Sequence, residues 1–159
     1  MTILGVDPGT AVTGYGVVAL EGGGAVSLVE CGVIRTDRQL PMPQRLRSIF
    51  EGLGEVIERH RPDALAVEGV FYGRNVRTTV ALGQARGVIL LAGARRDLAV
   101  HEYSPAEVKN AIVGTGRATK EQVQFMVQRL LSLKAAPSPA DAADGVAVAL
   151  AHCFSGVPA

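Results

Sequence analysis

Residues 139–152 read Pro139-Ala140-Asp141-Ala142-Ala143-Asp144-Gly145-Val146-Ala147-Val148-Ala149-Leu150-Ala151-His152, an alanine-rich apolar segment that predicts a helix. Its two acids, Asp141 and Asp144, stand at i and i+3, so they lie about 60° apart on one face of that helix. Free backbone N–H groups and the helix dipole favour negative charge in a first turn. A structural interpretation is therefore open, with Asp141 as the N-terminal cap and Asp144 as a helix-end charge. The pair indicates a catalytic or metal-binding site only if other acidic residues lie beside it.

Two short apolar runs elsewhere in the chain also end in an acid. Residues 3–7, Ile3-Leu4-Gly5-Val6-Asp7, predict a strand that stops before Pro8, because proline cannot donate to a sheet ladder. Residues 64–68 end in Glu68, and since they are apolar on both faces and follow a predicted helix, they fit a buried parallel strand. Open α/β sheets place their sites at the carboxyl ends of strands. All four acids would meet there if the last helix packs across the sheet.

The order of the predicted elements indicates a mixed five-stranded α/β sheet flanked by helices. Strands are expected at residues 3–7, 14–20, 25–35, 64–68 and 99–103, and the first three form an antiparallel meander. Helices are expected at residues 41–60, 76–95, 105–113 and about 119–133, with Thr119 as a cap, and over the segment quoted first. No repeat or low-complexity tract interrupts the pattern, so residues 1–159 are expected to form a single domain.

The composition is that of a folded protein with a basic middle segment. Hydrophobic residues make up 48% of the 159 residues and charged residues 19%, which excludes a disordered chain. No apolar run reaches the ~18 residues of a membrane span, and the N-terminus lacks the pattern of a signal peptide. Cys31 and Cys153 have no metal-ligand spacing, so free thiols in a reducing cytoplasm are expected.

Charge is unevenly distributed along the chain. Residues 74–120 hold eight Arg or Lys against three acids, although the net charge of the whole chain is only +1. This distribution favours one positive face of the kind that binds nucleic acid. An ordinary solvated surface is the alternative.

Clustered carboxylates repel one another and raise each other's pKa values unless a cation joins them. Mg²⁺ is a hard cation that takes oxygen ligands and keeps several waters, and Mn²⁺ accepts the same ligands. Two such ions about 4 Å apart can activate a water and stabilise the leaving oxygen in phosphodiester hydrolysis. The spacing of the acids is thus compatible with a two-metal nuclease.

Five stretches carry a more specific signal. They are Asp7-Pro8-Gly9-Thr10 with Gly14-Tyr15-Gly16, Val67-Glu68-Gly69-Val70-Phe71, Leu82-Gly83-Gln84-Ala85-Arg86-Gly87, Ile112-Val113-Gly114-Thr115-Gly116 and Asp141-Ala142-Ala143-Asp144. Together, in order over nearly the whole chain, they resemble the RuvC family of bacterial Holliday-junction resolvases. Gly69 departs from the polar residue that usually follows the glutamate in that family, which affects local geometry and not the ligand set.

The resemblance implies a ribonuclease H-like fold and a homodimer. It implies divalent-metal-dependent nicking of four-way DNA junctions in recombination and repair, with two ions of Mg²⁺, or of Mn²⁺, in each active site. It further implies cooperation with the RuvA–RuvB branch-migration complex in the bacterial cytoplasm.

The resemblance also assigns roles to residues. The catalytic and metal-binding positions, here called the four acids, are Asp7, Glu68, Asp141 and Asp144. The candidates for DNA binding are Phe71, Arg74, Asn75, Arg77, Lys109, Arg117 and Lys120. Phe71 falls where the family enters the opened junction centre, and stacking on a base contributes about 1–3 kcal/mol; packing under the next helix is its alternative. Lys109 and Lys120 fall on phosphate-binding positions near the active site, and Lys109 can steady charge at the scissile group. The role of Tyr72 stays open.

Gly83 and Gly87 stand four positions apart in the predicted helix 76–95, on a small face that permits close backbone approach, with Leu82, Ala85, Ile89 and Ala92 as apolar area nearby. A two-fold interface over part of this helix would set two active sites symmetrically on a junction, whereas packing on its own sheet is the alternative. His152 lies about 12 Å along the last helix from Asp144, too far to share a metal, so it is expected to be structural.

Three other functions are open at this stage. The strand–Asp–x–Gly–Thr turn at Asp7 also resembles that of actin-like ATP-binding proteins and sugar kinases, which need two such domains. A nuclease of the same fold acting on RNA–DNA hybrids or ribosomal RNA precursors is the second alternative. The third is a junction-binding module without catalysis, in which the four acids would be incidental.

Overall fold

Five strands and five helices follow one another in the predicted order in a computed structural model that describes residues 1–69, 73 and 75–159. The strands are β1 (Thr2–Asp7), β2 (Val12–Leu20), β3 (Val26–Arg35), β4 (Ala64–Glu68) and β5 (Ala99–Tyr103). The helices are α1 (Met42–His60), α2 (Val76–Ala94), α3 (Pro105–Val113), α4 (Lys120–Leu130) and α5 (Ala140–Ser155). None of the helices in the described ranges is both long enough and apolar enough to span a membrane.

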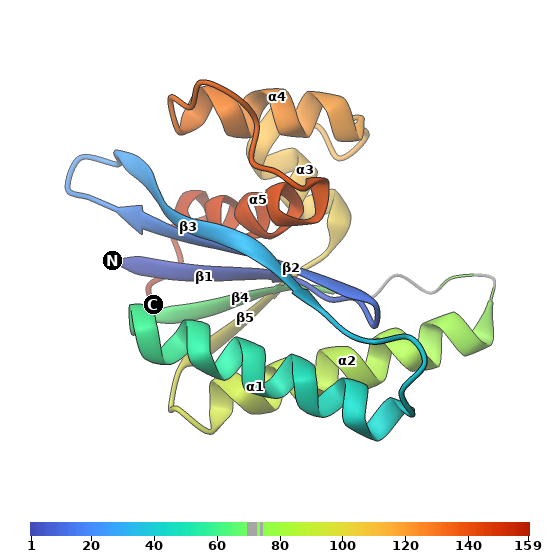
Figure 1. Ribbon diagram of the computed structural model, residues 1–159. Helices are drawn as coiled ribbons and strands as arrows, with labels where there is room; N and C mark the ends of the chain where they lie inside the picture. Colours follow the sequence, from blue (N-terminus) through green and yellow to red (C-terminus); the bar gives the residue numbers. More distant parts are fainter. Residues whose placement is uncertain (70–72, 74) are drawn as a thin grey trace.

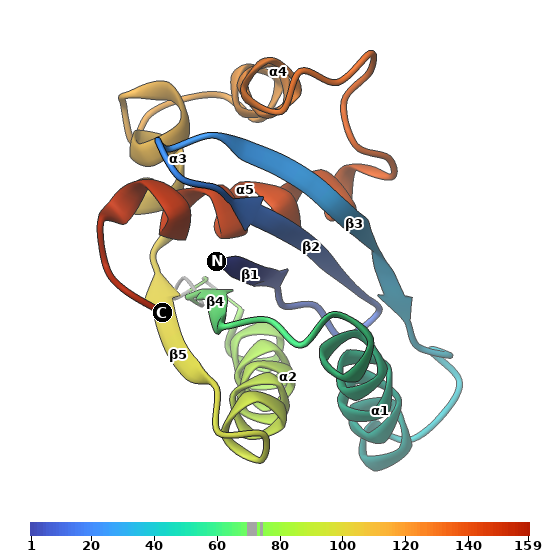
Figure 2. The same cartoon turned by 90° about the vertical axis from the view of Figure 1, so that its left-hand side faces the viewer.

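The strands form one mixed sheet in the order β3-β2-β1-β4-β5. The first three strands make the predicted antiparallel meander, whereas β4 runs parallel to β1, and β5 runs parallel to β4. Helices α1 and α2 cover one face of the sheet, and α5 crosses the other face with α3 and α4 stacked outside it (Figures 1 and 2). Because β1 and β4 are parallel neighbours, Asp7 and Glu68 lie at the same edge of the sheet, as the sequence predicts.

Several element boundaries differ from the prediction, and for two of them the structure shows the reason. β2 begins at Val12 and not at residue 14, because Thr13 pairs with Ile34 and lengthens the hairpin. α4 ends at Leu130 and not near residue 133. A turn replaces the last predicted residues of this helix, since Ser132 takes a positive φ of 52° and the Gln128 side chain donates to two backbone carbonyls beyond it.

Helices α3 and α4 each begin with a capping box. The Ser104 hydroxyl accepts from the backbone N–H of Glu107, whose carboxylate accepts in return from the N–H of Ser104. Thr119, the predicted cap, makes the same reciprocal pair with Gln122. Substituting a capping residue by alanine typically costs about 1 kcal/mol, so these boxes fix where each helix starts. They thereby fix the positions of Lys109 and Lys120 on the first turns above the sheet edge.

The backbone of α5 lies directly on β1 and β2. A Cβ atom on Gly5 would collide with the backbone of Gly145 and Ala149, and one on Gly14 would collide with the carbonyl of Asp141. From the helix side, a Cβ on Gly145 would lie 2.5 Å from the Cα of Tyr15. Only residues without a side chain allow this approach, so these three glycines set the height and the register of α5 over the sheet.

Burial of the α5 side chains holds the helix in that position. Val146, Val148 and Leu150 are fully buried, and they join a cluster with residues of the sheet, α3 and α4. Each such side chain contributes roughly 1.5–3 kcal/mol when it is removed from water. The apolar surface that holds α5 on the sheet is therefore the source of the energy that positions Asp141 and Asp144.

Replacement of Gly14 by alanine is expected to push α5 away from the sheet. Gly14→Ala should lower the free energy of unfolding by about 1–3 kcal/mol, measured by urea denaturation, because the new methyl group meets backbone that cannot move aside. Gly22→Ala is the matched control, since a Cβ there meets nothing within 4 Å, and it should stay within about 0.5 kcal/mol of the wild type. Equal effects of the two substitutions would contradict the close contact.

Candidate active site

Asp7 is the last residue of β1, and the turn that follows it is held by a buried threonine. Asp7 pairs with Gly14 in the β1–β2 ladder. The Thr13 hydroxyl donates to the Gly9 carbonyl at 2.7 Å and accepts from the Gly9 N–H at 3.3 Å, and its side chain is fully buried. Thr13 lies just outside the strand that the sequence predicts at residues 14–20. The only signal for its role was a polar residue directly before a glycine-rich apolar strand.

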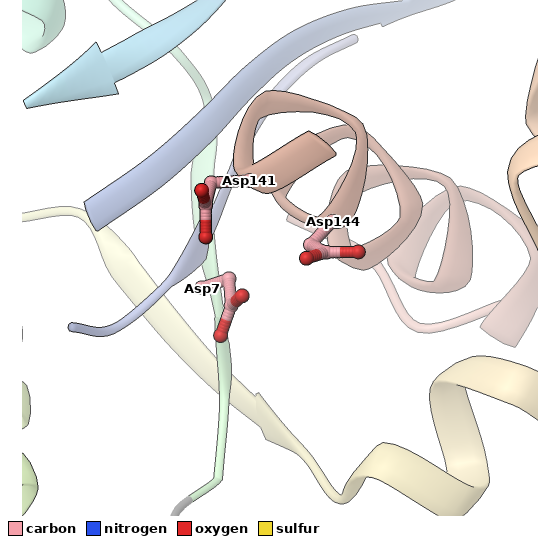
Figure 3. Close-up of side chains that lie close together, drawn as sticks. All are labelled: Asp7, Asp141 and Asp144. Carbon is pink, nitrogen blue, oxygen red and sulfur yellow. The ribbon is translucent and has the colours of Figure 1, made fainter. Parts of the chain in front are cut away.

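Asp141 and Asp144 project from the first turns of α5 toward Asp7. The helix begins at Ala140, with Pro139 in the cap position and no side chain capping it. The structural interpretation of Asp141 as the N-terminal cap is therefore wrong. One carboxylate oxygen from each of Asp7, Asp141 and Asp144 lies within 4.8 Å of the other two, and Figure 3 shows these side chains converging from the strand and the helix.

Glu68 approaches Asp7 from the neighbouring strand. It lines a pocket of about 300 Å³ together with Asp7 and Asp144, and Lys109 and Lys120 line the same pocket. Glu68 does not belong to the three-residue cluster within 4.8 Å, but its charge acts on Asp7 more strongly than that of Asp144 or Asp141. All four acids are therefore gathered at one edge of the sheet, where the sequence predicts them.

The electrostatics of the pocket favour a bound cation. Burial, followed by the charge of Glu68, raises the pKa of Asp7 to about 8 from its ordinary value of 3.8. Burial also raises the pKa values of Glu68 and Asp144. Without a cation, the cluster can be charged at neutral pH only at a cost in free energy, and a divalent ion would remove that cost.

A lysine side chain of this protein already contacts one of the four acids. The Lys120 ammonium lies 3.0 Å from Oδ2 of Asp144, and its side chain is 55% exposed whereas that of Asp144 is 23% exposed. The contact partly offsets the effect of burial on Asp144 and raises the pKa of Lys120. Oxygen donors that already attract an ammonium ion are the donor set that Mg²⁺ or Mn²⁺ takes, so the residues present fit a divalent metal.

The structure places the remaining DNA-binding candidates in different ways. Arg77 lies exposed in the first turn of α2, and Arg117 lies exposed on the loop between α3 and α4. Asn75 caps α2, because its side-chain oxygen accepts from the Thr78 N–H at 3.3 Å, which leaves its NH₂ group for other contacts. Phe71 and Arg74 lie outside the described residues, as does Tyr72.

His152 has the structural role that its distance from Asp144 predicts. It is fully buried in α5, its Nδ1 shares a 2.7 Å hydrogen bond with the Tyr103 hydroxyl, and its ring packs against His101 with centroids 4.5 Å apart. Burial lowers the pKa of His152, so the ring is kept neutral. It ties α5 to β5 and takes no part in the acid cluster.

Comparison with known proteins gives a consistent result. The profile of the family described as "Crossover junction endodeoxyribonuclease RuvC" matches residues 3–152. Crossover junction endodeoxyribonuclease RuvC of Pelotomaculum thermopropionicum is 51% identical over 152 residues, which cover 96% of this chain and 92% of that protein. A structure of Thermus thermophilus RuvC superposes with a TM-score of 0.90 at 40% identity, and one of T. thermophilus RuvC in complex with a Holliday junction substrate with a TM-score of 0.88 at 38%. Each superposition covers 97% of this chain and 94% of the other.

A mixed sheet with carboxylates gathered at one edge and backed by a helix defines the class of ribonuclease H-like nucleases. Within that class, the chain belongs to the RuvC family of crossover junction endodeoxyribonucleases. The predicted family and fold are thereby confirmed, and the actin-like ATP-binding alternative is set aside.

The raised pKa of Asp7 predicts an unusual pH dependence of the metal-free protein. Between pH 4 and 8 the folded state holds a proton on Asp7 that the unfolded state has released, so this group's stabilising contribution is lost as pH rises through that window. Urea denaturation in EDTA should therefore show the wild type losing stability relative to Asp7→Asn as pH rises from 5 to 8, by at most about 1.4 kcal/mol per pH unit.

Added Mn²⁺ should reverse this loss in the wild type, because an ion on the carboxylates replaces the proton. The Asp7→Asn variant should gain less stability from Mn²⁺ at every pH. A constant difference between the two proteins across the pH range would contradict the raised pKa.

Proposed function

We propose that this chain is a divalent-metal-dependent endonuclease that resolves four-way DNA junctions by phosphodiester hydrolysis, in recombination and repair. The observation that carries the proposal is the meeting of the four acids at the sheet edge, where Asp7, Glu68 and Asp144 line one pocket with two lysines and Asp141 lies against Asp7 and Asp144. The T. thermophilus relative, which superposes over 97% of this chain, binds a Holliday junction substrate. The RNA-directed nuclease and the binding module without catalysis have no comparable support.

The four acids are the proposed ligands of two ions, with Mg²⁺ as the expected metal and Mn²⁺ as a substitute. Asp7 is the proposed central ligand, because it clusters with Asp141 and Asp144 and is also the acid on which the charge of Glu68 acts. Bound there, the ions would supply activation of a water and stabilisation of the leaving oxygen at the scissile phosphate. The chain's own contribution is to hold four mutually repelling carboxylates in place before the metal arrives, which the buried contact of α5 with the sheet supports.

The lysines of the pocket are the proposed phosphate contacts. Lys109 projects from α3 and Lys120 from the first turn of α4. Both side chains line the pocket of about 300 Å³ that Asp7, Glu68 and Asp144 also line. Lys120 pairs with Asp144. When a divalent ion takes Asp144, the ammonium of Lys120 would be free to hold a phosphate oxygen, and both lysines would stabilise negative charge that develops there.

The other DNA contacts are proposals that rest on position and on the family. Arg77 and Arg117 are exposed near the same edge and suit contacts with the sugar-phosphate backbone. Asn75 has an NH₂ group left for a base edge. The proposed contacts of Phe71 with an unpaired base and of Arg74 with phosphate fall on residues outside the described ranges.

A homodimer through α2 is proposed from the outward face of that helix. Ala85, Ile89 and Ala92 are buried in the protein's own core, so the expectation that they supply interface area is wrong. The outward face instead carries Val76, Val80, Gly83, Gly87 and Leu91, which are exposed and follow helical spacing. A Cβ on either glycine meets nothing within 4 Å, which leaves room for a second helix. A monomeric mass by light scattering at working concentration would contradict this dimer.

Three further features are proposed from the family alone. The chain is expected to form a single nuclease domain over residues 1–159. It is expected to act with the RuvA–RuvB branch-migration complex. Its expected compartment is the bacterial cytoplasm.

Asp144→Asn is expected to abolish cleavage while leaving DNA binding intact. Loss of a residue that hydrogen-bonds to a metal ligand typically costs about 10–100-fold in affinity or activity, so removal of a ligand itself should lower the rate by more than about a hundredfold. The measurement is cleavage of a labelled four-way junction with Mg²⁺ or Mn²⁺, beside a linear duplex and an RNA–DNA hybrid. Wild type should make paired symmetric nicks in the junction only.

Asp97→Asn is the matched control, because Asp97 is an exposed acid after α2 whose φ of 54° asparagine also adopts readily. This variant should cleave at the wild-type rate. Full activity of Asp144→Asn would contradict the metal assignment. Preferential cleavage of the hybrid by the wild type would instead contradict the proposed substrate.

A further inference from the structure

Residues 35–47, here called the 35–47 segment, connect β3 to the first turns of α1 and contain four arginines and one acid. The basic stretch identified from the sequence, residues 74–120, does not include them. The fold brings the segment back to the edge where β1 ends, beside the turn that follows Asp7 (Figure 1). A second group of positive charge therefore lies at the catalytic edge.

Hydrogen bonds attach the 35–47 segment to the catalytic turn. The Thr36 N–H donates to the Ala11 carbonyl at 3.0 Å, and the Thr36 hydroxyl donates to the Thr10 carbonyl. Arg45 reaches back from α1, donating through Nη2 to the same Thr10 carbonyl at 2.8 Å and through Nε to the Thr36 hydroxyl at 3.1 Å. These hydrogen bonds hold the segment against Thr10 and Ala11, which follow Asp7 closely in the chain. Arg45, one of the four arginines, makes two of the bonds.

The register of the sheet places Arg35 on the same face as α5. Arg35 pairs with Val12, and directly paired residues share a face of the sheet. Val12 and Gly14 lie on the same face because they are two positions apart, and a Cβ on Gly14 would point at the carbonyl of Asp141. Arg35 therefore extends from the side of the sheet on which the acid-bearing end of α5 rests.

Three arginines of the segment carry charge that the fold does not use. Arg35, Arg38 and Arg47 are exposed, and in the described part of the chain no hydrogen bond or ion pair joins their guanidinium groups to another residue. The one acid of the segment, Asp37, accepts from the Gln39 N–H at 2.9 Å. Elsewhere, Arg59, Arg86 and Arg96 are each paired with a glutamate. Unpaired arginines beside a phosphodiester-cleaving site suit phosphate oxygens, which match the guanidinium fork.

We infer that Arg35, Arg38 and Arg47 form a second contact surface for the DNA backbone, on the flank of the active site opposite Lys109 and Lys120. Lys109 comes from α3, which directly follows the edge strand β5, whereas Arg35 ends the other edge strand, β3, and the segment then leads into α1 (Figures 1 and 2). A junction strand seated at the four acids would be held by phosphate contacts on both sides. The inference rests on the proposed function, since the ligand is the same DNA.

The test is the salt dependence of junction binding by the triple variant Arg35→Gln, Arg38→Gln, Arg47→Gln. Each phosphate contact contributes about 0.9 to the slope of log affinity against log salt for duplex arms. The triple variant should therefore lose about 2–3 from the slope and at least about tenfold in affinity at low salt. Fluorescence anisotropy with a labelled four-way junction in EDTA measures both quantities.

The triple variant Arg61→Gln, Arg95→Gln, Arg129→Gln is the matched control. It removes the same charge from exposed positions at or beyond the ends of α1, α2 and α4, away from the acids. Its slope should stay close to that of the wild type. Equal slopes and affinities for the two triple variants, with a wild type that binds the junction, would overturn this inference alone. A wild type that binds the junction no better than a linear duplex would overturn the proposed function and this inference with it.

Discussion

The direct contact between the backbone of α5 and strands β1 and β2 is the constraint on which the rest of the structure depends. Gly5 and Gly14 on the strands and Gly145 on the helix remove the side chains that would separate them. Because the helix cannot be raised or rotated without losing this contact, the positions of Asp141 and Asp144 over Asp7 follow from it. The apolar residues of α5 supply the free energy, and the glycines supply the geometry. A helix held by larger side chains would place its acids farther from the strand ends.

Placing these carboxylates close together is electrostatically unfavourable. Partly buried carboxylates crowd together, and burial with the charge of Glu68 raises the pKa of Asp7 to about 8. Two features reduce the repulsion between the carboxylates. The raised pKa favours a proton on Asp7, and the Lys120 ammonium contacts Asp144. A divalent ion can replace both the proton on Asp7 and the Lys120 ammonium at Asp144. The electrostatic cost of burying the carboxylates therefore favours metal binding. Stability and the proposed catalysis conflict at these residues, because a substitution such as Asp7→Asn would relieve repulsion and remove a proposed metal ligand at once.

The sequence predicted most of the fold and the location of the four acids, since both follow from short-range patterns. Apolar runs ending in Asp7 and Glu68 predicted two strand ends, and helical spacing predicted the last helix with its acids. The remaining features depend on contacts between distant segments. Thr13 is a local case, since it fell outside the predicted strand and its hydrogen bonds with Gly9, four residues away, form only in the folded turn. The pairing of Lys120 with Asp144 and the attachment of Arg45 to Thr10 join residues far apart in the chain. Counting charge along the sequence therefore found residues 74–120 and missed the 35–47 segment.

The central claim is that the contact of α5 with the sheet builds a site for divalent metal between the four acids. Anomalous scattering from crystals soaked in Mn²⁺ tests it most directly, because the ion is located without reference to activity. Anomalous peaks are expected among the carboxylate oxygens of Asp7, Glu68, Asp141 and Asp144, and the Lys120 ammonium is expected to have moved away from Asp144. Ordered Mn²⁺ elsewhere on the protein, with Lys120 still paired to Asp144 and no peak among the four acids, would contradict it.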